Sequence, residues 1–122
     1  VPIVVRAPSK SQFVQEPSTA LLILKLLSEK DMYGYEMIDT LAKRSENVFA
    51  LKAGTLYPLL HTLVSQGHLT CYEEERSGKV RKYYRITGEG RRFLARKEEE
   101  WREYSGAVAK VLGFGGVACG NA

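Results

Sequence analysis

Five basic residues lie within the ten positions Arg76–Arg85, and this stretch contains no acidic residue. Three glutamates, residues 73–75, come directly before it. Lysine and arginine side chains bind phosphate oxygens, and each such contact with DNA releases condensed counterions. We therefore expect Lys79, Arg81 and Lys82 to bind the DNA backbone. The alternative interpretation is a solvated hairpin whose charge is balanced by the glutamates.

Two β-prone runs, residues 69–75 and 80–87, are joined by the dipeptide Ser77-Gly78. Glycine accepts a positive φ without steric cost, so this dipeptide is typical of a tight turn. The pattern predicts an antiparallel hairpin that carries the basic residues near its tip. From there they can reach phosphates beside a DNA groove.

A helix is predicted directly before the hairpin, from about residue 53 to residue 67. Its apolar residues recur at the spacing of a buried stripe, and they are Leu56, Leu59, Leu60, Leu63 and Val64. The opposite face carries short or polar residues that can approach a groove closely: Thr55, Tyr57, Pro58, His61, Thr62 and Ser65. Pro58 removes one backbone hydrogen bond near the helix start. Two roles stay open for Tyr57, packing at the rim of the core or contact with DNA.

Two earlier helices are predicted to complete a three-helix unit. The first begins at Ser18 and has a broad apolar face, formed by Leu21, Leu22, Leu24 and Leu27. Residues 31–34 are expected to be a turn, after which apolar residues return at helical spacing: Tyr35, Ile38, Leu41 and Ala42. We therefore predict a mainly α fold with a small β-hairpin (α+β), a winged helix-turn-helix over residues 18–88.

A last helix is predicted over residues 89–112. Apolar residues repeat along it every seven positions with others interleaved, as in a coiled-coil seam, and they are Leu94, Trp101, Tyr104, Val108 and Val111. A core closed by three helices leaves this seam without a partner, so we expect it to form the interface of a homodimer. Residues 1–17 are expected to be a flexible arm, and residues 113–122 a flexible glycine-rich tail.

Composition limits the possible functions of these 122 residues. One domain of this length buries a core but leaves little room for an enzyme cleft. The net charge of +4 and the pI near 9.1 favour an anionic partner such as double-stranded DNA. The sequence has no phosphate-binding glycine loop and no nucleophile with a base at readable spacing, so we expect neither an enzyme nor a bound cofactor.

Cysteine usage and hydropathy point to a cellular compartment. Cys71 and Cys119 are isolated and lack the spacing of a disulfide framework, which favours a reducing environment. No apolar stretch approaches the roughly 20 residues that cross a bilayer. We therefore expect a cytoplasmic protein that does not bind a membrane.

Several motifs together resemble the PadR family of bacterial and archaeal transcriptional regulators. They occur in the family's order and approximate spacing, in residues 24–27, 33–36, 54–61 and 81–87, with Gly67 and Gly90. The resemblance covers residues 18–112 and implies a winged helix-turn-helix whose third helix enters the major groove while the wing grips the flanking backbone. It also implies a dimer on an inverted repeat, usually a repressor. The single C-terminal helix resembles the family's short class.

The resemblance also suggests which residues contact DNA. Carried over position by position, they are Lys52, Thr55, Tyr57 and Pro58 at the head of the reading helix, with Lys79, Arg81 and Lys82 on the wing. Lys52 departs from the family, which commonly has a serine or similar cap there. A lysine supplies no side-chain acceptor to the helix start, and its charge opposes the helix dipole unless a phosphate binds nearby. Val64 replaces an acid that is frequent in the family.

Trp101 has two possible roles in the seam. The simpler role is an anchor of the dimer interface, because tryptophan buries the largest apolar surface. In multidrug-binding relatives, a tryptophan at a similar distance after the Tyr-Arg-hydrophobic-Thr strand stacks planar aromatic ligands beside its twofold mate. That resemblance makes Trp101 a candidate site for a small aromatic effector, and we weigh the anchor ahead of it.

Two other function classes stay open. A metal-sensing or redox-sensing regulator is suggested by His61, His68 and Cys71, although a metal site needs more convergent ligands than these positions predict. A winged helix that binds a protein with its hairpin is the other class. Neutralising the basic residues of the wing would distinguish this class from a DNA-binding wing. Only for a DNA-binding wing should the affinity then depend less steeply on salt.

Overall fold

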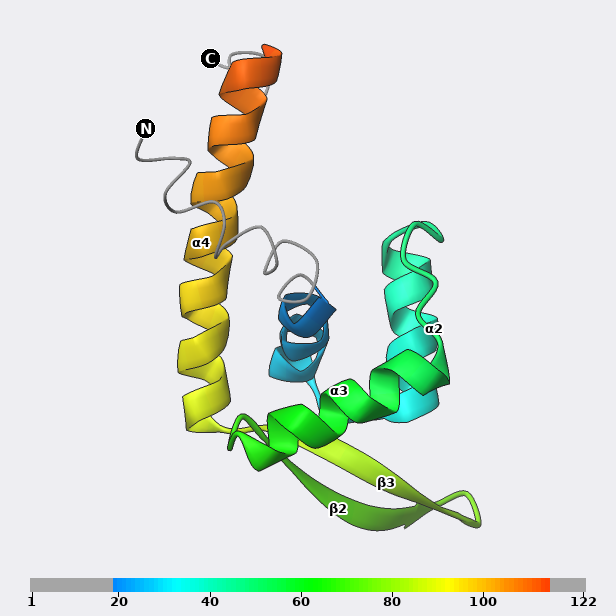
Figure 1. Cartoon of the computed structure of the whole chain (residues 1–122). Coiled ribbons are helices and arrows are strands. Elements are labelled where there is room, and N and C mark those ends of the chain that lie inside the picture. Colours follow the sequence, from blue (N-terminus) through cyan, green and yellow to red (C-terminus); the bar gives the residue numbers. More distant parts are fainter. Residues whose placement is uncertain (1–18, 115–122) are drawn as a thin grey trace.

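The computed structural model describes residues 19–114, which form a winged helix-turn-helix with a long C-terminal helix (Figure 1). The first elements are a helix over residues 19–29, strand β1 (Met32–Tyr33), helix α2 (Gly34–Arg44) and helix α3 (Ala53–Ser65). Strands β2 (Leu69–Arg76) and β3 (Lys79–Ile86) and helix α4 (Gly88–Leu112) follow. The predicted α+β fold is confirmed. The predicted arm and most of the predicted tail, with Cys119, lie outside the described residues.

The hairpin forms with the predicted turn. Strands β2 and β3 pair antiparallel from Leu69 opposite Ile86 at the base to Arg76 opposite Lys79 near the tip. Ser77 and Gly78 both have positive φ, at 53° and 77°. Two such residues give the turn a twist that matches the twist of the flanking strands, so the strands stay paired to the tip.

A third strand was not predicted. Residues 31–34 were expected to be a turn, but Met32 and Tyr33 form β1, which pairs antiparallel with Tyr84 and Tyr83 of β3. The sheet order is therefore β1-β3-β2, with β3 in the centre. A strand of two residues has no periodicity that sequence patterns can detect. Through it, the wing is joined directly to the start of α2.

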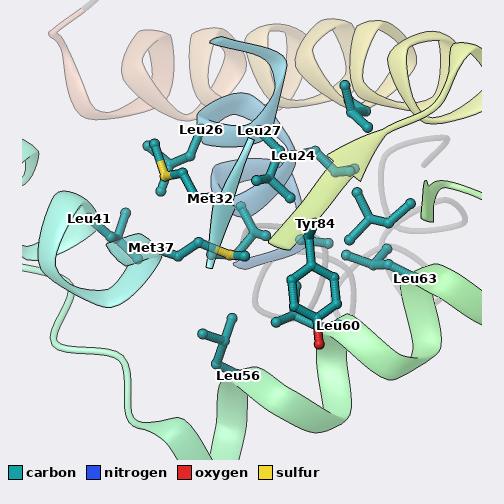
Figure 2. Packing of buried hydrophobic residues seen from close by; sticks show 14 of the residues in the cluster. Leu24, Leu26, Leu27, Met32, Met37, Leu41, Leu56, Leu60, Leu63 and Tyr84 are labelled. Carbon is teal, nitrogen blue, oxygen red and sulfur yellow. The ribbon is translucent and has the colours of Figure 1, made fainter. Parts of the chain in front are cut away.

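The core lies between the three N-terminal helices and the inner face of the sheet (Figure 2). The predicted stripe of α3 is buried most completely at Leu56, Leu60 and Leu63, whereas Leu59 and Val64 are half-buried. Helix 19–29 contributes Leu24 and Leu27. Further core residues come from every other element: Met32, Met37, Leu41, Leu69, Tyr84, Ile86 and Leu94.

Only the first turns of α4 pack on this core. The Thr87 side chain caps the helix by accepting a hydrogen bond from the Gly90 amide at 2.9 Å. Leu94 is 7% exposed and belongs to the core. Beyond Leu94 the helix extends past helix 19–29 and away from the sheet (Figure 1). The predicted seam is thus divided, because Leu94 packs within its own chain and the exposed apolar residues begin at Trp101.

Replacing Leu60 with alanine tests the packing of α3. Leu60 is fully buried, so we expect the free energy of unfolding to fall by about 2–5 kcal/mol from reduced burial and the cavity left behind. Urea unfolding followed by circular dichroism measures the change. Leu112→Ala is the control, because this leucine is 60% exposed at the end of α4. Equal stability of the two variants would contradict the proposed core.

Candidate nucleic-acid interface

The outer face of α3 is exposed and free of negative charge. All the residues predicted to form this face are exposed, and α3 contains no acidic residue. The hydroxyls of Thr62 and Ser65 bind backbone carbonyls of their own helix, with Thr62 Oγ1 donating to the Pro58 oxygen at 3.0 Å. Those of Thr55 and Tyr57 make no hydrogen bond to any described residue. The head of α3 therefore offers hydroxyl groups that are available to a ligand.

The first turn of α3 also lacks a side-chain cap. Lys52 occupies the N-cap position with extended backbone, and its side chain makes no capping hydrogen bond. The predicted consequence of a lysine at this position is thus confirmed. Amide groups at an uncapped helix start bind anions well, and a lysine beside them adds positive charge.

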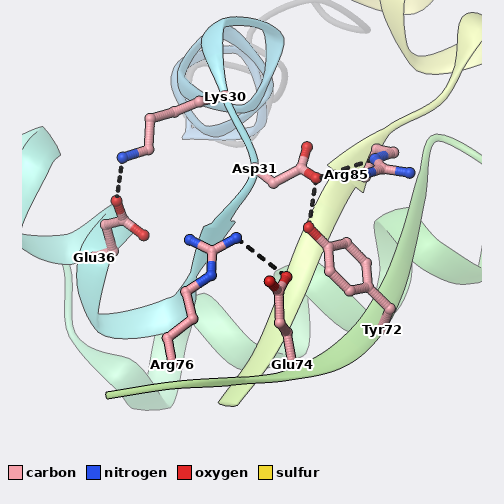
Figure 3. A network of polar contacts seen from close by, with 7 residues as sticks. All are labelled: Lys30, Asp31, Glu36, Tyr72, Glu74, Arg76 and Arg85. Carbon is pink, nitrogen blue, oxygen red and sulfur yellow. Dashed lines mark hydrogen bonds and ion pairs between the residues drawn. The ribbon is translucent and has the colours of Figure 1, made fainter. Parts of the chain in front are cut away.

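The basic residues of the hairpin separate into two groups. Arg76 pairs with Glu74 at 3.1 Å, and Arg85 pairs with Asp31 at 2.9 Å (Figure 3). Within residues 19–114, the three remaining cations of the hairpin form no ion pair, and they are Lys79, Arg81 and Lys82. These are the wing residues that were predicted to bind phosphate, and their charges are not neutralised within the described chain.

Arginine and tyrosine side chains stack on the outer face of the sheet. The guanidinium carbons of Arg76 and Arg81 lie 4.4 and 4.5 Å from the ring centres of Tyr83 and Tyr33. Tyr83 also contacts the rings of Tyr33 and Tyr72, with centroids 5.5 and 5.8 Å away. As a result Tyr83 is 1% exposed although it lies outside the main core cluster.

Asp31 anchors the wing at its base. Its Oδ2 accepts hydrogen bonds from the Tyr72 hydroxyl at 2.5 Å and from Arg85 Nε at 3.0 Å (Figure 3). Burial, the largest single influence, would raise the pKa of Asp31. The hydrogen bonds from Tyr72 and Arg85, with the charges of Arg85 and Arg76, outweigh burial and lower this pKa. The carboxylate therefore stays charged and holds β2 and β3 against the residue that precedes β1.

A hollow of about 340 Å³ joins the reading helix, the wing and the start of α2. It is lined by Tyr33, Gly34, Tyr35, Tyr57, Arg81, Lys82 and Tyr84. A Cβ atom on Gly34 would lie 2.1 Å from the Tyr57 hydroxyl oxygen, so the glycine makes room for that hydroxyl. Tyr57 is 41% exposed, and it lines the hollow as well as the edge of α3. The head of α3 and the wing thus meet around one concave surface.

Sequence reasoning did not place Tyr33, Gly34, Tyr35 or Tyr84 in a site. The glycine-tyrosine pair at the start of α2 was noted as a motif, but its contact with Tyr57 spans 23 positions of the chain. Tyr84 lies in a strand rich in basic residues, and nothing in the sequence distinguishes its role from that of the neighbouring Tyr83. Only the three-stranded sheet brings Tyr84 beside α2.

Residues 23–96 match the family described as the transcriptional regulator PadR-like family. The chain belongs to the PadR-like family. Its fold is similar to a transcriptional regulator from Clostridium thermocellum, with a TM-score of 0.73, 34% identity, and coverage of 80% of this chain and 95% of that one. A PadR family regulator from Clostridium difficile gives a TM-score of 0.67 at 37% identity, covering 76% and 96%. The transcriptional regulator Rv3488 of Mycobacterium tuberculosis is 29% identical over 107 residues, covering 88% of this chain and 94% of that protein.

Membership of the PadR-like family establishes the class of function. PadR proteins are transcriptional regulators that bind DNA, and they are not enzymes. Within the described residues one helix, α4, follows the sheet, in agreement with the predicted C-terminal helix. None of the helices in the described part is long and apolar enough to span a membrane.

The exposed part of α4 in this PadR regulator carries the other residues that were predicted to form the dimer interface. Trp101 and Tyr104 stack at a centroid distance of 5.9 Å and an interplanar angle of 30°, and each is 40% exposed. Val108 and Val111 continue the exposed apolar surface toward Gly113, whose left-handed backbone ends the helix.

The three residues that suggested a metal or redox sensor differ in exposure and lie on different parts of the fold. His61 is exposed on α3, and Cys71 is exposed on β2. His68 is buried and stacks on Phe93 of α4 at 4.3 Å. Across residues 19–114 no group of three or more metal-binding side chains is found.

Replacing Asp31 with asparagine tests the anchor of the wing. At pH 7 we expect the free energy of unfolding to fall by about 1 kcal/mol, because Tyr72 and Arg85 lose a charged acceptor. The pKa of Asp31 lies below its ordinary value of 3.8, so the wild type has this stability above that pH and loses it as the pH falls through the lowered pKa. Urea unfolding at pH 7 and pH 3 should show a difference that shrinks at pH 3.

The matched control is Asp39→Asn. Asp39 pairs with the exposed Lys43 at 3.0 Å on α2, and surface pairs of this kind contribute little. A loss of stability for Asp31→Asn that is the same at both pH values would show that the charge of Asp31 is not the cause.

Proposed function

We propose that this PadR-family chain is a ligand-responsive repressor that binds an inverted-repeat operator as a homodimer. The observation that carries the proposal is the hollow where Tyr57 of α3 meets Arg81 and Lys82 of the wing. It supports one continuous surface in which α3 reads the major groove and the wing binds flanking phosphates. Such a regulator acts on chromosomal DNA in the cytoplasm.

The proposed DNA contacts follow from chemistry and exposure. Lys52, Thr55, Tyr57 and Pro58 form the head of α3, which has unused hydroxyls, uncapped amides and no carboxylate. Lys79, Arg81 and Lys82 supply cations without ion pairs in the described chain. Phosphate contacts position such a protein on the duplex, and contacts to base edges from the head of α3 give sequence preference.

The homodimer is supported by the exposed apolar side of α4. Trp101, Tyr104, Val108 and Val111 lie at coiled-coil spacing and are exposed, whereas Leu94 packs in its own core. A twofold pair of α4 helices would bury the exposed side chains and hold two reading helices apart. The half-sites should then be separated by one helical turn of DNA, about 34 Å, or a multiple of it.

The proposed effector is a small planar aromatic molecule that stacks on Trp101. The exposed stack of Trp101 and Tyr104 supports this proposal, because a flat ring can add to it. The same stack also suits a plain anchor of the dimer. The two roles are separable by experiment, since only the first requires a ligand.

Neutralising the wing tests DNA binding. The triple variant Lys79→Gln, Arg81→Gln, Lys82→Gln should bind every duplex more weakly. Its slope of log affinity against log salt should be shallower by about 0.9 for each DNA phosphate that the variant no longer neutralises. Fluorescence anisotropy with a labelled duplex at several salt concentrations measures both quantities.

The control removes the same charge elsewhere, with Lys25→Gln, Lys43→Gln and Arg92→Gln. These three cations pair with carboxylates of their own helices, at 3.9, 3.0 and 2.8 Å. We expect the control to keep most of the wild-type slope. Equal slopes for the wing variant and the wild type would favour a wing that binds protein rather than DNA.

Dye binding tests the effector role of Trp101. Planar cationic dyes should quench its fluorescence, which reports this residue alone because it is the single tryptophan of the chain. Trp101→Phe should bind the dyes at least several-fold more weakly, as measured by dye fluorescence, while sedimentation still shows a dimer. Unchanged emission across a panel of such dyes would leave Trp101 as an interface anchor.

A further inference from the structure

The hollow between α2, α3 and β3 is lined by hydrogen-bond donors and contains no carboxylate. Its charged groups are Arg81 and Lys82, and neither forms an ion pair with a described residue. The first turn of α2 opens onto it at Gly34 and Tyr35, and no side chain caps this turn. Glu36, the acid of that turn, is bound by Lys30 at 2.7 Å and is not a lining residue (Figure 3).

Tyr84 is the strongest sign that the hollow receives a ligand. Only 7% of this residue is exposed, and it lines the hollow. Figure 2 shows its ring entering from β3 with the hydroxyl directed toward α3. That hydroxyl makes no hydrogen bond to any described residue. The hydroxyl oxygen is not among the fully enclosed polar atoms that lack a partner, so it is open to the hollow, where a ligand oxygen can accept its proton.

The hydroxyls in the hollow can act as donors at neutral pH. Burial raises the pKa of Tyr84, with smaller contributions from Cys71 and Tyr57, so its proton is retained. The Tyr57 hydroxyl lies against Gly34 and also lacks a hydrogen bond to a described residue. Two hydroxyls, two cations and uncapped amides together suit an oxyanion with several acceptor oxygens.

We propose that this hollow binds a single phosphate of the DNA backbone, held by the hydroxyls of Tyr84 and Tyr57, by Lys82 and by the first turn of α2, with Arg81, which stacks on Tyr33, at the rim. The proposal rests on the proposed function, since it assigns a specific subsite within the DNA-binding surface. A backbone phosphate is favoured over a free anion because the hollow lies between the two elements proposed to contact DNA. Bound there, it would fix the depth of the head of α3 in the groove.

Gly34 is the residue that shapes this subsite. A Cβ at this position would meet the Tyr57 hydroxyl oxygen at 2.1 Å and its ring carbon at 2.6 Å. Gly34→Ala must therefore displace the Tyr57 side chain from the hollow. A side chain on Gly106 of α4, by contrast, would meet no atom within 4 Å. Gly106→Ala is thus a control that leaves the subsite and the head of α3 unchanged.

The test compares Tyr84→Phe with Tyr83→Phe, because both remove one hydroxyl of a buried tyrosine, from adjacent positions of β3. Anisotropy with a random-sequence duplex should show about tenfold weaker binding for Tyr84→Phe, the size expected for a hydrogen bond to a charged group. Its salt slope should equal that of the wild type, because no charge is removed. Tyr83→Phe, whose side chain is on the opposite face, should bind as the wild type does.

Two further variants keep the inference testable if Tyr84→Phe is unstable. Tyr57→Phe removes a hydroxyl that has no place in the core, and it should also weaken binding about tenfold. Gly34→Ala should weaken binding more than Gly106→Ala. Thermal unfolding of each variant identifies those that retain the wild-type fold. Wild-type affinity in the folded hydroxyl variants would overturn the phosphate subsite.

The outcomes separate this inference from the proposed function. Failure of the wild type to bind any duplex would contradict the proposed function itself. Binding by the wild type that is unaffected by loss of either hydroxyl would contradict only the subsite. Calorimetric titration with inorganic phosphate distinguishes the other source of the same chemistry. Submillimolar binding that Tyr84→Phe abolishes, without any change in DNA affinity, would assign the hollow to free phosphate and overturn the proposal.

Discussion

The central position of β3 is the constraint on which the other parts of this structure depend. Near its base this strand is hydrogen-bonded to β1 on one side and to β2 on the other, and these bonds fix its register. Its inner face sends Tyr84 and Ile86 into the core, so it cannot shift by one residue without exposing them. The same strand carries Arg81 and Lys82, whose positions relative to α3 are therefore set by core packing.

The distribution of carboxylates decides which cations are left for a ligand. Asp31 and Glu74 neutralise Arg85 and Arg76 on the outer face of the sheet, where stacked tyrosines fill the space between them. Nothing comparable neutralises Lys79, Arg81 and Lys82 in the described chain. The Asp31–Arg85 pair thus lies at the base of the wing and the Glu74–Arg76 pair near its tip, while the unpaired Arg81 and Lys82 line the hollow beside an acid-free α3. Long-range attraction of DNA follows from this separation rather than from the net charge of +4 alone.

Local patterns were sufficient to predict the helices, the hairpin and the turn at Ser77-Gly78, because each has its own periodicity or turn chemistry. Long-range features were not predictable in this way. The pairing of Met32 and Tyr33 with β3 depends on tertiary packing, and so does the contact of Gly34 with Tyr57. Leu94 shared the heptad spacing of the exposed seam, but its burial depends on where α4 leaves the core. Spacing identifies a face of a helix and cannot tell which neighbour covers it.

Recognition of a DNA sequence by α3 and the wing as one surface is best tested by competition binding near physiological salt. The two competitors are the DNA upstream of the chain's own gene and a shuffled fragment of equal composition. We expect preferred binding to the upstream fragment by a dimer, with the preference reduced in Thr55→Val. Absence of binding to both fragments would rule out DNA as the ligand of this surface and favour a partner protein as the ligand of the wing.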